Sequence, residues 1–153
     1  MATTVIAADL TVTVTESYTL NGVNYGNTMN KTFTSNGEVI QRIMTIAAQS
    51  RGSAWTNIIN FGAADAAGIA DITNYKYFRI KNLDDTNFLE LRVTGTADSF
   101  FVKIKAGETF LLMDNEIDAV ASGTTIGTLT DITQIAANAD TDGVDIEFVV
   151  VTA

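Results

Sequence analysis

The fold of this chain is decided by residues 75–113, which read YKYFRIKNLDDTNFLELRVTGTADSFFVKIKAGETFLLM. Three short runs in this stretch alternate apolar and polar side chains, and clusters of Asn, Asp, Gly and Thr separate the runs. Alternation with a period of two, bounded by turn residues, is typical of antiparallel strands that bury one face. The stretch therefore predicts a set of half-buried strands.

The first two runs predict a hairpin. Their apolar side chains share one face, which carries Phe78, Ile80, Leu89, Leu91 and Val93. Symmetric pairing about the turn at residues 82–87 places Arg79 opposite Glu90, and opposite charges in facing positions favour this register.

The third run extends the hairpin into a meander. Phe100, Val102 and Ile104 are expected to point inward, and the side chains expected to point outward are Phe101, Lys103 and Lys105. The next turn, residues 105–108, has Gly107 where a positive φ costs little. Residues 109–113 form a nearly continuous apolar run, which predicts a strand covered on both faces. A meander of this kind belongs to a sandwich or a barrel.

Further strands are predicted along the rest of the chain. Asn21-Gly22 is the strongest short hairpin signal, since both residues accept the positive φ of a tight turn. The segments that we predict as other strands, or as parts of them, are residues 3–15, 28–34, 39–48, 55–61 and 143–152. Residues 62–70 are predicted as a short helix or a loop of small residues, and residues 118–133 as loop with short strands.

These elements predict the fold class: an all-β, single-domain antiparallel β-sandwich of jelly-roll type spanning residues 1–153. A length of 153 residues and a hydrophobic fraction of 46% suit one ordinary globular domain. No run reaches the ~20 apolar residues of a membrane span, and the first residues, MATTVIAADL, lack the basic region of a secretory signal. We therefore expect no membrane association.

The absence of two residue types argues against catalysis. The chain has no Cys, which excludes disulfides, thiolate nucleophiles and cysteine-ligated zinc. It has no His, which is the commonest general base and the usual ligand of zinc, copper and iron. No serine can be activated by a histidine. We expect neither an enzyme nor a bound cofactor.

Charge is unevenly distributed along the chain. Residues 1–105 hold nine acidic and nine basic side chains, whereas residues 106–153 hold nine acids and no base, so the net charge of −9 lies in the last third. A surface of this sign repels nucleic acid, which we do not expect as a partner. The acidic third is either a solvated surface or one half of a contact with basic residues of a neighbouring subunit. The basic side chains that we predict at such an interface are Lys76, Arg79, Lys81, Lys103 and Lys105.

Three groups of side chains are candidate ligand or catalytic sites. Asp140, Asp142 and Asp145 surround a glycine as in a fragment of a calcium loop, but the full calcium spacing is absent and an Asp-Gly turn before the last strand is the better explanation. The pair Asp84 and Asp85 could serve glycoside hydrolysis or simply form a turn.

The third group is aromatic. Trp55, Tyr75 and Tyr77 could form a platform on which a sugar ring stacks, or they could be core and rim residues of the sandwich.

Two segments carry a family resemblance. Residues 78–91 (FRIKNLDDTNFLEL) and 101–112 (FVKIKAGETFLL) resemble small virion proteins of tailed bacteriophages, and the closing strand at 144–151 fits the same pattern. The resemblance implies a jelly-roll or sandwich module of the capsid decoration (cement) type. It also implies the major capsid protein as partner, a homotrimer, and a place on the capsid surface after assembly in the host cytoplasm. It supplies no catalytic residues.

We therefore expect a phage virion structural protein that decorates or cements the capsid by binding neighbouring capsid subunits. Two alternatives remain open on the sequence. One is a carbohydrate- or receptor-binding β-sandwich module of a phage tail or fibre, and the other is a glycosidase that uses carboxylates alone.

Overall fold

Every regular element in the described part of the chain is a β-strand. The computed structural model describes residues 6–50, 54–62, 70–71, 75–96, 99–113, 116–117 and 129–152. Its strands, in chain order, are β1 (Ala8–Glu16), β2 (Thr19–Leu20), β3 (Val23–Asn24), β4 (Asn27–Asn36), β5 (Glu38–Ile46), β6 (Thr56–Gly62), β7 (Ala70–Asp71), β8 (Tyr75–Asn82), β9 (Leu89–Thr94), β10 (Ser99–Ile104), β11 (Thr109–Leu112), β12 (Glu116–Ile117), β13 (Thr130–Asp131), β14 (Gln134–Ala139) and β15 (Val144–Thr152).

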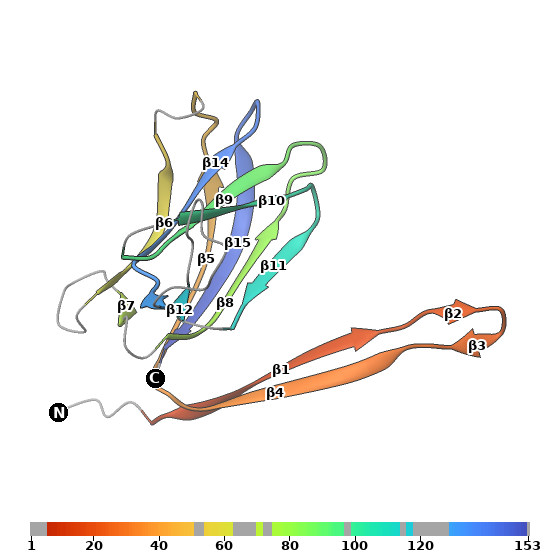
Figure 1. Cartoon of the computed structure of the whole chain (residues 1–153). Coiled ribbons are helices and arrows are strands. Elements are labelled where there is room, and N and C mark those ends of the chain that lie inside the picture. Colours follow the sequence, from red (N-terminus) through yellow and green to blue (C-terminus); the bar gives the residue numbers. More distant parts are fainter. Residues whose placement is uncertain are drawn as a thin grey trace.

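Eight of these strands form a two-layer sandwich (Figure 1). One sheet has the order β11-β8-β15-β5, and the other has the order β10-β9-β14-β6, with the two-residue β7 added parallel to β6. Counted along the chain, the first of the eight pairs with the last, the second with the seventh, the third with the sixth and the fourth with the fifth, all antiparallel. This is the arrangement of a long hairpin rolled over on itself, so the predicted jelly roll is confirmed.

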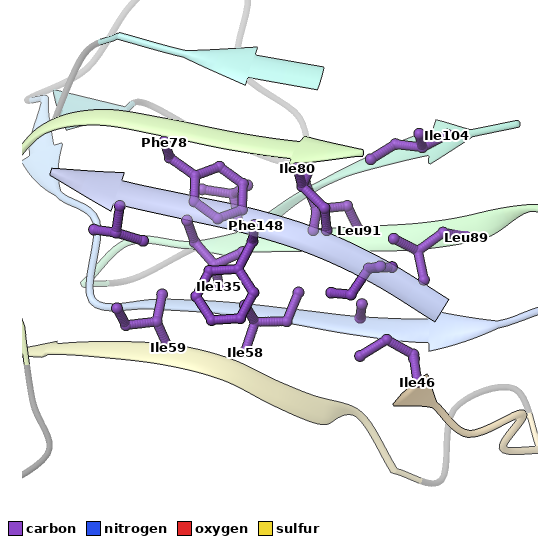
Figure 2. Close-up of a cluster of buried hydrophobic side chains, with 14 of the residues drawn as sticks. Ile46, Ile58, Ile59, Phe78, Ile80, Leu89, Leu91, Ile104, Ile135 and Phe148 are labelled. Carbon is purple, nitrogen blue, oxygen red and sulfur yellow. The ribbon is translucent and has the colours of Figure 1, made fainter. Parts of the chain in front are cut away.

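The space between the sheets is filled with apolar side chains from both layers (Figure 2). The predicted inward faces are confirmed, because Phe78, Ile80, Leu89, Leu91 and Val93 are all fully buried. The largest other fully buried side chains are Ile46, Ile132, Ile135, Val144, Ile146, Phe148 and Val150. The closing strand was also predicted correctly, and it lies in the middle of its sheet between β5 and β8.

The predicted hairpin of β8 with β9 is wrong, whereas the second pairing of the predicted meander, β9 with β10, is confirmed. Strands β8 and β9 lie in different sheets and face each other across the core. The buried Asn82 side chain stabilises the connection between the two layers. Its Nδ2 donates to the carbonyls of Asn87 and Ile104, and its Oδ1 accepts from the Asp84 N–H. Crossing lets both strands bury their apolar faces against each other, which pairing side by side would not do.

Residues 8–36 form a long hairpin arm that projects from the sandwich (Figure 1). β1 pairs with β4 and β2 pairs with β3, with Leu10 opposite Phe33 near the root and Leu20 opposite Val23 at the tip. Asn21 has a φ of 52° and Gly22 a φ of 80°, so the predicted tight turn is confirmed.

The other sequence predictions divide between confirmed strands and segments that the structure does not describe. The strands predicted within residues 39–48 and 55–61 are confirmed as β5 (Glu38–Ile46) and β6 (Thr56–Gly62), and Gly107 makes its turn with a φ of 73°. Of the helix or loop predicted at residues 62–70, Gly62 ends β6 and Ala70 begins β7, and residues 63–69 lie outside the described residues, as do residues 118–128 of the segment 118–133.

The two environments of leucine in this fold provide a matched test. Replacing Leu91 with Ala should reduce the free energy of unfolding by about 2–5 kcal/mol, because a fully buried aliphatic side chain is truncated. The same change at Leu20, which is 57% exposed on the arm, should cost less than about 0.5 kcal/mol. Urea denaturation of both variants measures the two changes in the free energy of unfolding. Equal reductions would contradict the assignment of Leu91 to the core and of Leu20 to an exposed face.

Candidate functional site

The arm has one face made only of small polar side chains. Residues that face each other across an antiparallel pair lie on the same side of the ribbon. On this side Thr11 faces Thr32 and Thr15 faces Thr28. The two Thr pairs bring their hydroxyl oxygens to 3.2 and 3.4 Å of each other, so these four hydroxyl groups have hydrogen-bond partners within the face.

The opposite face of the arm is mostly apolar. Its facing pairs, from root to tip, are Leu10 with Phe33, Val12 with Lys31, Val14 with Met29, Glu16 with Asn27, Tyr18 with Tyr25, and Leu20 with Val23. In water, a two-stranded hairpin alone is only marginally stable. A ribbon with one apolar face is therefore stabilised when that face packs against another protein surface.

The sandwich itself covers the root of this apolar face. Phe33, Leu10 and Val12 pack against the outer side of the four-stranded sheet, where they contact side chains that include Tyr77 and Val151. The rings of Phe33 and Tyr77 are 6.2 Å apart between centroids. Burial raises the pKa of the Tyr77 phenol above its ordinary value, and the charge of Arg79 opposes this only in part.

Hydrogen bonds fix the root in place. The Asn36 amide donates to the carbonyls of Ala8 and Phe33, both at 2.8 Å, which ties β1 to β4. The Gly37 N–H donates to the carbonyl of Thr152 at 3.0 Å, which ties the arm to the end of β15. The arm is therefore a fixed extension of the sandwich.

No described residue of the sandwich covers the outer part of the apolar face. Its exposed side chains and their exposed fractions are Tyr18 (56%), Leu20 (57%), Val23 (52%), Tyr25 (51%) and Met29 (50%). The rings of Tyr18 and Tyr25 stack at 5.5 Å with an interplanar angle of 16°. We call residues 17–30 the arm tip; this segment contains no acidic or basic side chain. Uncharged surfaces rich in Tyr and Met are typical of the centres of protein interfaces.

A second candidate surface lies on the flank of the sandwich. Within the described chain, β5 pairs with β15 on one side only, so its other edge has free backbone groups. Beside this edge, the opening between the sheets forms a cleft of about 410 Å³. We call it the β5–β6 cleft, and it is lined by Glu38, Ile40, Arg42, Asn57, Ile58, Ile59, Asn60 and Phe148. On the outer side of the same strand, Val39 and Ile43 are 65% and 66% exposed.

The basic residues predicted at an interface do not form one patch. Arg79 and Lys81 belong to β8 in the four-stranded sheet, and Lys76 lies at a β-bulge near the start of that strand. Lys103 lies on β10 in the other sheet, with its Nζ 3.6 Å from the centroid of the Phe88 ring. Lys105 sits in the turn that follows and is 3.9 Å from Glu108.

Arg79 pairs with a different carboxylate from the one that we predicted. Its guanidinium contacts Glu147 on the neighbouring β15 at 2.5 Å, and Gln41 donates to the same carboxylate oxygen at 3.0 Å. Glu90 is not opposite Arg79, because β8 and β9 lie in different sheets; it faces Lys103 on β10. The hydrogen bond from Arg79 lowers the pKa of the Glu147 carboxyl, and desolvation opposes this shift.

The two acidic candidates form turns. Asp84 accepts hydrogen bonds from the N–H groups of Asn87 at 2.6 Å and Thr86 at 2.8 Å, and these bonds lower the pKa of its carboxyl. Asp85 accepts from the Thr86 hydroxyl at 2.9 Å. Both carboxylates thus shape the crossing between β8 and β9.

The aspartates of the last turn have separate roles. The Asp142 carboxylate accepts from the Gly143 N–H, whereas Asp145 accepts from the Thr45 hydroxyl. Among the described residues, no three carboxylates are grouped in a way that could hold a metal ion.

The predicted aromatic platform is not assembled. Tyr75 and Tyr77 are 5% and 6% exposed; the first packs in the core against Phe61, and the second lies under the arm. Trp55 lies apart from both, with the Arg92 guanidinium 5.1 Å from its ring centroid and the Phe101 ring at 5.6 Å.

Sequence reasoning missed the apolar face of the arm, although a signal for it was present. Counting outward from the predicted Asn21-Gly22 turn pairs Leu20 with Val23, then Tyr18 with Tyr25, in the register that the structure has. What the count could not supply is that, among the described elements, none lies over these residues.

Comparison with protein-family models, with curated proteins and with solved structures finds no match for this chain. Within its described residues, the structure has no helix of the length and apolar character that crossing a membrane requires.

The Arg79–Glu147 pair predicts a pH dependence of stability. Because the folded-state pKa of Glu147 is lowered, its contribution to stability is present above the unfolded pKa of about 4.3 and is lost as the pH falls through the folded value. Replacing Glu147 with Gln should lower the free energy of unfolding at pH 7 by up to about 1 kcal/mol, and this difference should shrink in acid.

Urea denaturation at a series of pH values measures the effect. The matched control is Glu108→Gln, because Glu108 lies 3.9 Å from Lys105 with both side chains largely exposed. The free energy of unfolding of Glu108→Gln should be close to that of the wild type at every pH. A Glu147→Gln difference that stays constant with pH would contradict the assignment.

Proposed function

We propose that this protein is a structural component of a tailed-bacteriophage virion that decorates or cements the capsid by binding neighbouring capsid subunits. The observation that carries the proposal is the arm, whose outer part exposes an uncharged apolar face that the described sandwich does not cover. A ribbon of this kind is stabilised when it lies against another protein. The resemblance of residues 78–91 and 101–112 to phage virion proteins supports the same function.

The dimensions of the arm suit a bridging role. The strand segment from Leu10 at the root to Leu20 at the tip has eleven residues, which corresponds to about 35 Å. The sandwich can therefore rest on one capsid subunit while the arm reaches the next. The net charge of −9 favours protein surfaces over nucleic acid as the site of attachment. We propose the major capsid protein as the partner.

A specific observation favours a second candidate function, binding of a receptor or carbohydrate by a tail or fibre module. Phe101 is 63% exposed next to Trp55 and Arg92 on the outer side of the five-stranded sheet. Aromatic rings beside a hydrogen-bonding group suit the face of a sugar ring. Glycan binding that is lost on replacing Phe101 with Ser, while capsid attachment is absent, would favour this function.

Cementing predicts a gain in particle stability that depends on the arm. Capsids stripped of this protein should lose resistance to heat or osmotic shock, and adding the wild-type protein should restore it. A short-arm variant, in which Asn-Gly replaces residues 17–26, should fail to restore it because four of the five exposed apolar side chains of the outer arm are removed. Release of encapsidated DNA on heating, followed with an intercalating dye, measures particle stability.

Phe101→Ser is the control, since it removes an exposed aromatic ring from the sandwich and leaves the arm intact. It should restore the particles as the wild type does. If the wild-type protein binds the particles and their stability is unchanged, the protein only decorates the capsid. Absence of any binding would refute both roles.

A further inference from the structure

Two exposed surfaces of this chain carry no net charge and could be covered by each other. The arm tip presents Tyr18, Leu20, Val23 and Tyr25, each about half exposed. The β5–β6 cleft lies beside the free edge of β5; its exposed lining is mostly polar, with Asn57 and Asn60 at the rim and the partly exposed Ile40 among its apolar members. Figure 1 shows that the arm runs away from β6, so the tip of one molecule does not point toward its own cleft.

We propose that the arm tip of one copy packs into the β5–β6 cleft of a second copy, along the free edge of β5. The contact is between copies of this chain, so it goes beyond capsid binding and does not depend on it.

The size of the cleft suits the side chains of the tip. A cavity of about 150 Å³ holds a benzene ring in an engineered protein core. The β5–β6 cleft of about 410 Å³ therefore has room for the stacked rings of Tyr18 and Tyr25. Their hydroxyl groups would remain near Asn57 and Asn60 at its rim, which can donate and accept hydrogen bonds.

The edge of β5 offers a second kind of contact. Backbone groups on an unpaired edge are a template for a strand from another chain, and addition of a strand is a common mode of recognition. The ribbon of the arm also has two free edges within the described structure. Val39 and Ile43, which flank the β5 edge on its outer side, would be covered by the same ribbon.

Charge favours these two surfaces over others for contact between copies. Molecules with a net charge of −9 repel one another, so copies meet best where neither surface has an excess of acid. The arm tip has no acidic or basic residue, and the cleft has one acid, Glu38, and one base, Arg42.

The side chains of the arm tip supply most of the area that a standard protein interface buries. The five half-exposed apolar side chains on the outer arm would bury roughly 500 Å², against about 800 Å² per partner in a standard interface. The remainder would come from the backbone edges. Because each copy gives one arm and accepts one, the contact is head-to-tail and generates a ring if the rotation closes.

A complementation experiment tests the proposal with two half-variants. The acceptor-only variant has the short arm, in which Asn-Gly replaces residues 17–26, and an intact cleft. The donor-only variant has an intact arm and the exposed positions Val39 and Asn57 both changed to Lys, which charges the edge of β5 and the rim of the cleft. Sedimentation equilibrium should show an oligomer for the wild type, a monomer for each half-variant alone, and a one-to-one dimer when they are mixed.

Each other outcome overturns the proposal. A wild-type monomer would mean that the arm binds another protein, such as the capsid protein, and not its own kind. A donor-only variant that still self-associates would mean that arms pack on arms. Two monomeric half-variants that do not combine would mean that the cleft is not the acceptor. Recovery of the dimer on mixing excludes misfolding as the cause of the monomeric state.

Neighbouring positions on the two faces of the arm provide a matched control. Tyr18→Lys, on the apolar face, should weaken self-association by roughly thirtyfold or more, as truncation of an interface hot spot does. Thr19→Lys, on the polar face, should leave it unchanged. Equal effects would mean that added charge, rather than the apolar face, controls association.

Discussion

The pairing of β15 with β5 and β8 is the constraint on which the rest of the structure depends. One side of β15 contributes Val144, Ile146, Phe148 and Val150 to the core. The other side contributes Val149 and Val151 to the cluster under the root of the arm. A strand that is covered on both sides reads as a continuous apolar run, which explains the sequence FVVV at residues 148–151. The same strand thus holds the sandwich closed and anchors the arm.

The faces of the strands could be predicted from sequence, whereas their partners could not. Alternation of apolar residues reports which side of a strand is buried, and it identified Phe78, Ile80 and Leu91 correctly. It does not report which strand lies alongside, because β8 and β9 would alternate in the same way in one sheet or in two. Arg79 illustrates this limit, since its true partner Glu147 is 68 residues away and the nearer Glu90 was an equally good match in charge.

The candidate surfaces could be predicted from sequence only in part. The turn that organises the arm was predictable, because Asn21-Gly22 has strong local preferences. The exposure of Tyr18 and Tyr25 was not, because the same alternation is typical of a strand buried in a sheet. The arm tip and the β5–β6 cleft are two of the places in the described structure where apolar side chains or free strand edges face solvent, and both suit contact with another protein.

The jelly-roll topology also determines the order in which the chain can fold. The first and last strands of the sandwich are neighbours, and the bond between Gln41 and Glu147 joins residues 106 apart in sequence. Contacts of such long range make folding slow, on the order of milliseconds to seconds, whereas a local hairpin forms in about 1–10 μs. The arm has only local pairings and precedes the sandwich in the chain, so it can form on the ribosome while β15 is still unmade. Until the last strand arrives, Val149 and Val151 are missing from the cluster under the arm, so each new chain passes through a state in which more of the apolar ribbon is open to other molecules than in the finished fold.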